Sequence, residues 1–227
     1  MPLHRLCIFD LDGTFAETAP DLVAALNRLL IEEGLPQADF KEARAYVGHG
    51  ARILIERAHR ANGIELDNAQ AVALTDRFIA HYAAHIADET YIFEHALTSM
   101  ETMREAGWRF AICTNKREHL ARQLLGALGV LEAFEAICGG DTFEMRKPNG
   151  QHILKTVEAA GGAPGGALMV GDSAPDIDAA KDAKIPVVGV TFGYTPGTIS
   201  DLRPDKVISS FADLPAVAEA LVPPQNA

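Results

Sequence analysis

Short apolar runs alternate with longer amphipathic stretches along most of the chain. The apolar runs of strand length lie at residues 5–9, 108–114, 135–140, 166–171, 186–191 and 205–210. Several of them are almost continuously apolar, which is typical of strands covered on both faces of a parallel sheet. Amphipathic stretches, such as residues 117–129 and 149–161, separate these runs. Strands that alternate with helices in this way predict a doubly wound α/β domain.

One interval departs from this alternation. From about Glu17 to about Glu89 there is no convincing strand, and four stretches in a row have helical character. They predict a small helical bundle at residues 17–89, inserted after the first strand of an α/β core built from residues 1–16 and 90–227. Because ligands bind at the carboxyl ends of strands in open α/β sheets, a bundle inserted there could close over a ligand.

Composition narrows the classes of partner. The 227 residues are 48% hydrophobic and 22% charged, which is ordinary for a globular protein, and the formal net charge is -11. An acidic surface disfavours nucleic acid and anionic membranes as partners. Three cysteines, Cys7, Cys113 and Cys138, lie in apolar runs and are expected to be buried and reduced. With no apolar stretch that suits a signal peptide or a membrane span, we expect a cytoplasmic protein.

The first candidate site is the segment FDLDGT, at the end of the first predicted strand. Side chains two apart on a strand point the same way, so the carboxylates of Asp10 and Asp12 could reach one pocket. Gly13 allows a sharp bend or a close approach to a ligand, and Thr14 could offer a hydroxyl to that ligand. The alternative is that Asp12 only forms a turn with Gly13.

A second group of acids follows the apolar run LMVG. Asp172 comes directly after this predicted strand, and Asp176 begins the next helix. Parallel strands end at one edge of a sheet, so Asp10 and Asp172 could converge there. Carboxylate ligands that leave room for water and phosphate suit Mg²⁺. Helix capping is the alternative role for Asp176.

Complementary groups follow two other predicted strands. Thr114 and Asn115 end the segment FAICTN, where a hydroxyl and an amide can donate to phosphate oxygens. Lys147 precedes Pro148, which favours an extended backbone and therefore a lysine that projects from a loop. A cation near three or four acids would offset the repulsion that an incoming phosphate dianion meets, about 4 kcal/mol for two unit charges 4 Å apart at an effective dielectric of 20.

The motifs DLDGT, CTN, RKP and VGDSAPD occur in this order, and together they resemble the haloacid dehalogenase superfamily of phosphotransferases. The resemblance implies a Rossmann-like core with an inserted helical cap. It implies that Asp10 is the nucleophile, that Asp12 is the general acid and then the base, and that Thr114 and Lys147 hold the phosphate. The presence of Asp12 points to phosphate chemistry, because dehalogenases of the superfamily lack this second acid.

The same resemblance implies a Mg²⁺ site. Its ligands would be Asp10, the backbone carbonyl of Asp12, and Asp172, with Asp176 assisting directly or through water.

Within the superfamily, the segments FDLDGTFAETAPDLVAALN and YVGHGARILIERA are similar to phosphoglycolate phosphatases and their close relatives. Gly48, His49 and Arg52 would then lie where the cap faces the substrate, with Arg52 able to bind a carboxylate. A solvated loop histidine and a surface arginine are the alternatives for His49 and Arg52.

Taken together, these features predict a Mg²⁺-dependent hydrolase of a small phosphate ester that acts through an aspartyl phosphate. A sugar phosphomutase of the same fold, such as one acting on a hexose phosphate, uses the same core residues and remains an alternative. A non-catalytic binding module is a further one. The sequence leaves the identity of the ester open and allows a monomer or a homodimer.

Overall fold

The computed structural model describes residues 5–224, except the side chain of His49. In this described part of the chain, six strands form one parallel sheet in the order β5-β4-β1-β6-β7-β8. Their bounds are β1 Arg5–Phe9, β4 Trp108–Cys113, β5 Ala136–Cys138, β6 Ala167–Gly171, β7 Val187–Val190 and β8 Lys206–Ile208. Each of the six predicted strands is confirmed. The chain first builds outward from β1 to β5, then returns to add β6 on the other side of β1.

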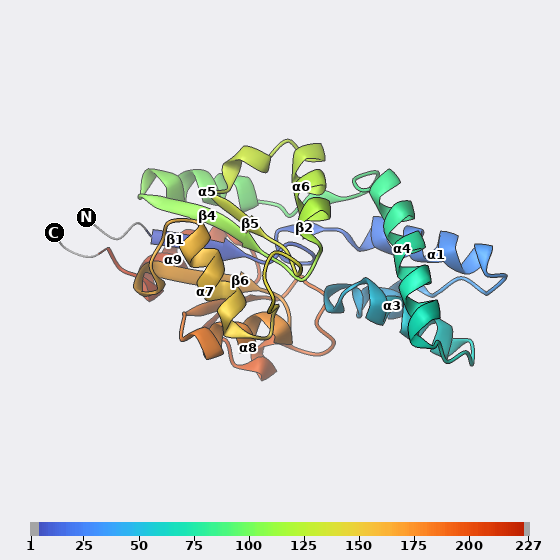
Figure 1. Cartoon of the computed structure of the whole chain (residues 1–227). Coiled ribbons are helices and arrows are strands. Elements are labelled where there is room, and N and C mark those ends of the chain that lie inside the picture. Colours follow the sequence, from blue (N-terminus) through green and yellow to red (C-terminus); the bar gives the residue numbers. More distant parts are fainter. Residues whose placement is uncertain (1–4, 225–227) are drawn as a thin grey trace.

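Helices cover both faces of this sheet (Figure 1). They are α5 Ala96–Glu105, α6 Glu118–Ala127, α7 Gly150–Ala159, α8 Ala174–Ala183 and α9 Leu214–Leu221. Successive side chains of a strand point to opposite faces: Phe9 packs in the cluster that includes α5, α6 and α9, whereas Ile8 packs in the cluster that includes α7 and α8. The predicted doubly wound α/β architecture is therefore confirmed.

The long insertion between β1 and β4 is helical. It holds α1 Ala19–Glu32, α2 Phe40–Arg44, the short 3-10 turn Val47–His49, α3 Ala51–Ala61 and α4 Asn68–Ala84. Helices α1 and α3 both pack against α4, and these helices extend beyond one end of the sheet in Figure 1. The side chains of Leu22, Leu26, Leu29 and Leu30 in α1 are buried. We refer to α1–α4 as the cap.

A pair of very short strands joins the cap to the core. Strand β2 Ala16–Glu17 pairs antiparallel with β3 Tyr91–Ile92, with Ala16 opposite Ile92. The strands have two residues each, which is too short to give an alternating pattern in the sequence. β2 ends at the predicted cap limit of 17 and β3 begins two residues after the limit of 89, and the limits themselves stay a prediction.

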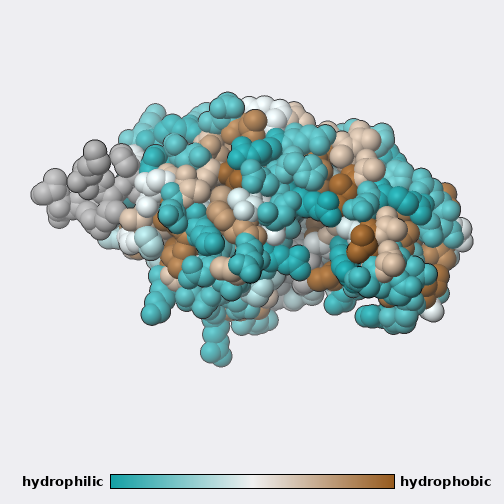
Figure 2. Space-filling model, in the orientation of Figure 1, coloured by the Kyte–Doolittle hydropathy of each residue, from teal (hydrophilic) through white to brown (hydrophobic). Residues whose placement is uncertain are grey.

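The face in Figure 2 is largely hydrophilic, with hydrophobic residues scattered over it. None of the helices within residues 5–224 combines the length and the apolar character needed to cross a bilayer. The three cysteines are free and buried, as predicted.

Candidate active site

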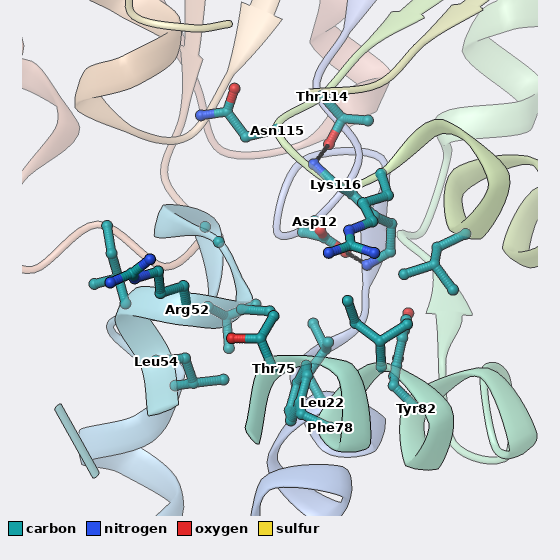
Figure 3. Close-up of a pocket in the computed structure, with 18 of the residues that line it drawn as sticks. Asp12, Leu22, Arg52, Leu54, Thr75, Phe78, Tyr82, Thr114, Asn115 and Lys116 are labelled. Atoms are coloured by element: carbon teal, nitrogen blue, oxygen red, sulfur yellow. Dashed lines mark hydrogen bonds and ion pairs between the residues drawn. The ribbon is translucent and has the colours of Figure 1, made fainter. Parts of the chain in front are cut away.

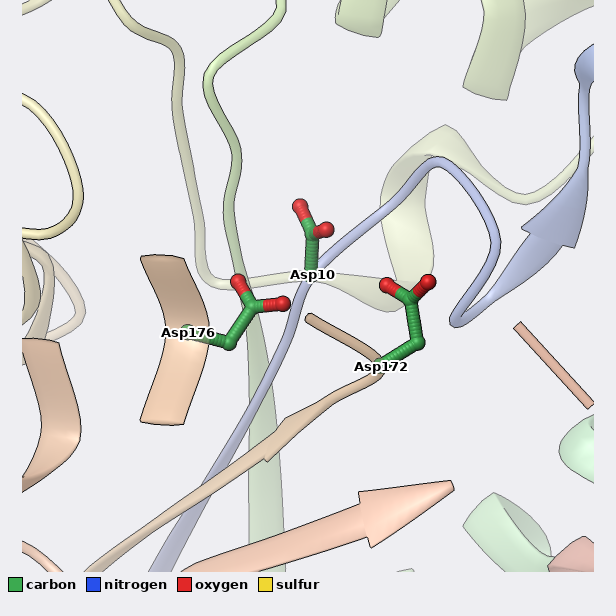
Figure 4. Close-up of side chains that lie close together, drawn as sticks. All are labelled: Asp10, Asp172 and Asp176. Carbon is green, nitrogen blue, oxygen red and sulfur yellow. The ribbon is translucent and has the colours of Figure 1, made fainter. Parts of the chain in front are cut away.

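Three adjacent strands bring their carboxyl ends, and the polar residues that follow them, to one edge of the sheet. Asp10 follows β1, Thr114 follows β4 and Asp172 follows β6. The backbone N–H of Asp10 still donates to the carbonyl of Val170 at 2.9 Å, so the first aspartate is fixed at the sheet edge. Asp10, Asp172 and Asp176 are buried, and each offers a carboxylate oxygen within 4.8 Å of those of the other two (Figure 4).

The ammonium group of Lys147 lies among these acids. Its Nζ is 2.8 Å from Oδ1 of Asp10 and 2.6 Å from Oδ1 of Asp176, and the residue is 2% exposed. Burial alone would lower the pKa of Lys147, but the two carboxylates raise it above its usual value, so the lysine stays charged. The loop carrying Lys147 is held by Asn115, whose Nδ2 donates to the Lys147 carbonyl at 3.0 Å.

Asp172 is held from several sides. The Thr14 hydroxyl donates to its Oδ1 at 3.0 Å, and the Tyr194 backbone N–H donates to its Oδ2 at 2.6 Å. Gly193 packs directly beneath it, because a Cβ at that position would lie 2.1 Å from the Asp172 Cβ. Gly13 has φ +81 and a Cβ there would lie 2.9 Å from Asp172 Oδ2, so both the backbone conformation and the space require glycine. The carboxylate is therefore oriented before any ligand arrives.

The place of Thr14 differs from the predicted one. We expected it to offer its hydroxyl to substrate, but Thr14 is fully buried and its hydroxyl donates to Asp172. It therefore orients a candidate metal ligand.

Asp176 has the capping role considered for it, and its assistance to a metal ion stays a prediction. Its Oδ2 accepts hydrogen bonds from the backbone N–H of Ser173 at 3.0 Å and from the Ser173 hydroxyl at 2.7 Å, which forms a capping box at the start of α8. Its Oδ1 faces Lys147. Asp176 therefore caps a helix and also orients the buried lysine.

The carboxylate cluster carries more negative charge than Lys147 offsets. Burial raises the pKa of Asp10 to about 7, helped by repulsion from Asp176 and, more weakly, Asp12, while Lys147 opposes the shift. Burial raises the pKa of Asp172 well above its usual range, helped by repulsion from Asp176 and Asp10. Buried hard oxygen donors with uncompensated charge fit a divalent cation such as Mg²⁺. Asp10 and Asp172 are the residues that would hold it, and the predicted contribution of the Asp12 carbonyl stays a prediction.

Asp12 lies beside this cluster and faces a second buried lysine. Its Oδ1 accepts hydrogen bonds from the Thr18 hydroxyl at 2.7 Å and from Nζ of Lys116 at 2.7 Å. Burial alone would lower the pKa of Lys116, but Asp12 raises it, so this lysine is also charged. Lys116 was not among the predicted site residues, although it directly follows Thr114 and Asn115 at a strand end.

A cavity of about 220 Å³ lies between the cap and the core (Figure 3). Its core side includes Asp10, Asp12, Thr114, Asn115 and Lys116. Its cap side includes Leu22, Val47, Gly48, Arg52, Thr75, Phe78 and Tyr82. Of the predicted site residues, those that face this space are Asp10, Asp12, Gly48, Arg52, Thr114 and Asn115. Thr14, Lys147, Asp172 and Asp176 do not line it, and the side chain of His49 lies outside the described residues.

Arg52 lines this cavity but is already engaged on the cap. Its Nε donates to Glu56 at 2.7 Å and its Nη1 donates to Asn68 at 3.0 Å, and 48% of its side chain is exposed. The surface-arginine interpretation describes these contacts, and substrate binding by Arg52 stays a prediction.

A partly buried ion pair connects the cap to the core beside the site. Nη2 of Arg44, on α2, is 2.7 Å from Oε2 of Glu17, and its guanidinium also donates to the carbonyls of Phe192 and Gly193. The Tyr194 hydroxyl donates to the other Glu17 oxygen at 2.6 Å. The sequence analysis did not identify this network, because its members are far apart in the chain and none belongs to the four motifs.

Fold and site together define a class: an α/β enzyme with a cluster of buried carboxylates and a buried lysine beside a helical cap. The comparisons with known proteins narrow this class. The family model for haloacid dehalogenase-like hydrolases matches residues 7–190. The chain belongs to this family, and it is a phosphatase.

The similar proteins match over nearly the full chain. A phosphoglycolate phosphatase from Agrobacterium fabrum is 46% identical over 222 residues, which cover 97% of this chain and 95% of that protein. One from Caulobacter vibrioides is 44% identical over 214 residues, covering 94% and 90%. The crystal structure of a predicted phosphoglycolate phosphatase from Haemophilus somnus has a TM-score of 0.87 at 29% identity, covering 94% of this chain and 97% of that chain.

A β-phosphoglucomutase from Clostridium difficile shares the fold as well. Its TM-score is 0.75 at 19% identity, covering 92% of each chain. This likeness shows the fold alone, so architecture does not separate a phosphatase from a mutase.

Proposed function

We propose that the enzyme hydrolyses 2-phosphoglycolate to glycolate and inorganic phosphate, with Mg²⁺ as cofactor and through an aspartyl phosphate on Asp10. The observation that carries the chemistry is the carboxylate of Asp10 next to the buried ammonium of Lys147, at the edge of the cap–core cavity. The substrate is supported by the relatives of 44–46% identity that are phosphoglycolate phosphatases.

In the first half-reaction, a carboxylate oxygen of Asp10 attacks phosphorus and the bond from phosphorus to the glycolate oxygen breaks. Asp12 donates a proton to that leaving oxygen. Lys147 and Thr114 hold the phosphate oxygens, so the transfer depends mainly on positioning and on charge stabilisation. When bound, Mg²⁺ offsets the charge that accumulates between the phosphate and the aspartates.

In the second half-reaction, Asp12 takes a proton from water, whose oxygen attacks phosphorus and releases phosphate from Asp10. Asp12 thus ends protonated, ready for the next turnover. Splitting the hydrolysis in two replaces one difficult step with two easier ones.

The size of the cavity beneath the cap favours a small substrate. Its helices enclose a cavity of about 220 Å³, which is below the roughly 300–1,000 Å³ of ordinary ligand pockets. We propose that the cap excludes water while the aspartyl phosphate forms and opens for the second step.

The nucleophile is tested with Asp10→Asn, which replaces the attacking oxygen by an amide of similar size. Phosphate release from 2-phosphoglycolate should fall to background, with the circular dichroism spectrum unchanged. Asp201→Asn, at an exposed aspartate, is the matched control and should retain activity. Turnover by Asp10→Asn at the wild-type rate would refute the assignment.

The same assay addresses the substrate and the phosphomutase alternative. A panel of phosphate monoesters, ranked by kcat/KM with Mg²⁺ present, should place 2-phosphoglycolate first. Free phosphate without an isomerised sugar phosphate supports hydrolysis, whereas isomerisation of a hexose phosphate without phosphate release would favour a mutase.

The other functional expectations stay predictions. They are a cytoplasmic location, the absence of nucleic acid and membrane partners, and a monomeric or homodimeric state.

A further inference from the structure

Lys116 is a buried cation that the proposed mechanism leaves without a role. It lies just after β4, and its side chain is 5% exposed. Its ammonium lines the cap–core cavity, 2.7 Å from Oδ1 of Asp12 and 4.6 Å from the centre of the Tyr82 ring on α4 (Figure 3). A buried ammonium is costly unless its donors find partners, so this position calls for an explanation.

The distance to Asp12 places Lys116 on the leaving-group side of the site. An acid that protonates the leaving oxygen must lie within hydrogen-bond distance of it, about 3 Å. The substituent on that oxygen therefore lies next to the Lys116 ammonium. In 2-phosphoglycolate this substituent is a methylene that carries a carboxylate, two bonds from the leaving oxygen. An ammonium has three N–H donors, so it can contact the substrate carboxylate while it also contacts Asp12.

The other cations that line the cavity within the described residues are placed differently. Arg52 already donates to two side chains of the cap, and nearly half of its side chain is exposed. Arg117 is also nearly half exposed, with a carboxylate 3.8 Å away, and Arg146 is exposed. Lys147 does not line the cavity; it lies between Asp10 and Asp176, on the side of the transferred phosphate. Lys116 combines burial with a position next to the acid.

We propose that Lys116 is a specificity-determining residue that selects phosphate monoesters with an anionic group next to the leaving oxygen, by donating to the carboxylate of 2-phosphoglycolate. The inference rests on the proposed function, because it takes Asp12 as the acid and the glycolate ester as substrate. The face of the Tyr82 ring limits where the ammonium can move, so it stays near the leaving group.

The test compares two substrates that differ mainly in this anionic group. In ethyl phosphate a methyl group replaces the carboxylate of 2-phosphoglycolate. Lys116→Met keeps the length of the side chain and removes its charge. We expect the ratio of the two kcat/KM values, 2-phosphoglycolate over ethyl phosphate, to fall by about 10- to 100-fold, the usual effect of losing a hydrogen bond between charged groups. This ratio does not depend on the fraction of enzyme that is folded.

Two further variants serve as controls. Lys41→Met removes one positive charge from an exposed position on α2 and should leave the ratio unchanged. Lys116→Arg keeps the charge and should retain most of the preference for the carboxylate.

The outcomes separate this inference from the function on which it rests. If Lys116→Met loses activity equally on both substrates, the lysine only positions Asp12 and the inference is overturned. If the wild type itself shows no preference for 2-phosphoglycolate, the proposed substrate and the inference both fail. If Lys116→Met is too slow to assay, calorimetry on Asp10→Asn and Asp10→Asn/Lys116→Met with Mg²⁺ compares binding of the two esters directly. An unchanged binding preference in the double variant also overturns the inference.

Discussion

The binding of Mg²⁺ is expected to strengthen as the pH rises, because the pKa values of the buried carboxyls of Asp10 and Asp172 are raised without it. The pKa of Asp10 is raised from 3.8 to about 7, first by burial and then by Asp176. Because the pKa of Asp10 is higher in the folded protein, its protonated carboxyl stabilises the metal-free fold, fully so below pH 3.8. This stabilisation is lost as the pH rises through about 7. For this one group the loss is about 4 kcal/mol at 1.36 kcal/mol per pKa unit.

The size of the change in Mg²⁺ affinity with pH follows from the same shift in the pKa of Asp10. Mg²⁺ binds the ionised carboxylate and must displace the proton, so near pH 6 most molecules must release a proton before the ion binds. We expect Mg²⁺ to bind at least about tenfold more tightly near pH 8 than near pH 6. The raised pKa of Asp172 acts in the same direction.

Isothermal titration calorimetry of the metal-free protein provides the measurement. Titrations near pH 6 in two buffers of different ionisation enthalpy should show release of about one proton or more per Mg²⁺ bound. Asp172→Asn should abolish tight binding, and the exposed Asp201→Asn should not. Equal affinities at the two pH values, with no proton released, would refute the electrostatic account of this cluster.

Three substitutions test other parts of the structure. Arg44→Met leaves the buried Glu17 without its ion-pair partner, so thermal unfolding should show a free energy of unfolding lower by about 1–3 kcal/mol. An unchanged melting temperature would mean that the pair contributes nothing to stability. Gly193→Ala puts a Cβ 2.1 Å from that of Asp172, so calorimetry should show weaker Mg²⁺ binding, and wild-type affinity would show that the loop can shift freely. Gly126→Ala, in α6 with open space around it, should raise the free energy of unfolding by about 0.5–1 kcal/mol in urea titrations, and destabilisation would contradict this.

The sequence predicted the sheet better than the elements around it. A strand buried on both faces needs an apolar run, and all six runs became strands of the sheet. The strands β2 and β3 were missed because two residues carry no periodic pattern. Helix α5 was not predicted either: its segment ALTSMETMRE mixes small, polar and apolar residues with little contrast between its faces.

In the site, residues that belong to a local motif could be predicted, whereas contacts between residues far apart in the chain could not. Asp10, Asp172 and Lys147 could be selected because each follows a strand in a recognisable motif, and parallel strands end at one edge. The supporting contacts could not be predicted. Tyr194 donates its hydroxyl to Glu17 across 177 positions, and Lys116 meets Asp12 across 104. Such partners depend on how the cap and the loops pack in three dimensions, which a local pattern does not encode.

The paired strands β2 and β3 have a consequence for how the gene could be altered. Because Ala16 lies opposite Ile92, the two ends of the inserted segment are neighbours in space. A chimera that exchanges the helices between them for those of another protein would therefore leave Asp10 and its sheet in place. The part of the gene that encodes the cap is therefore separable from the parts that encode the core with Asp10.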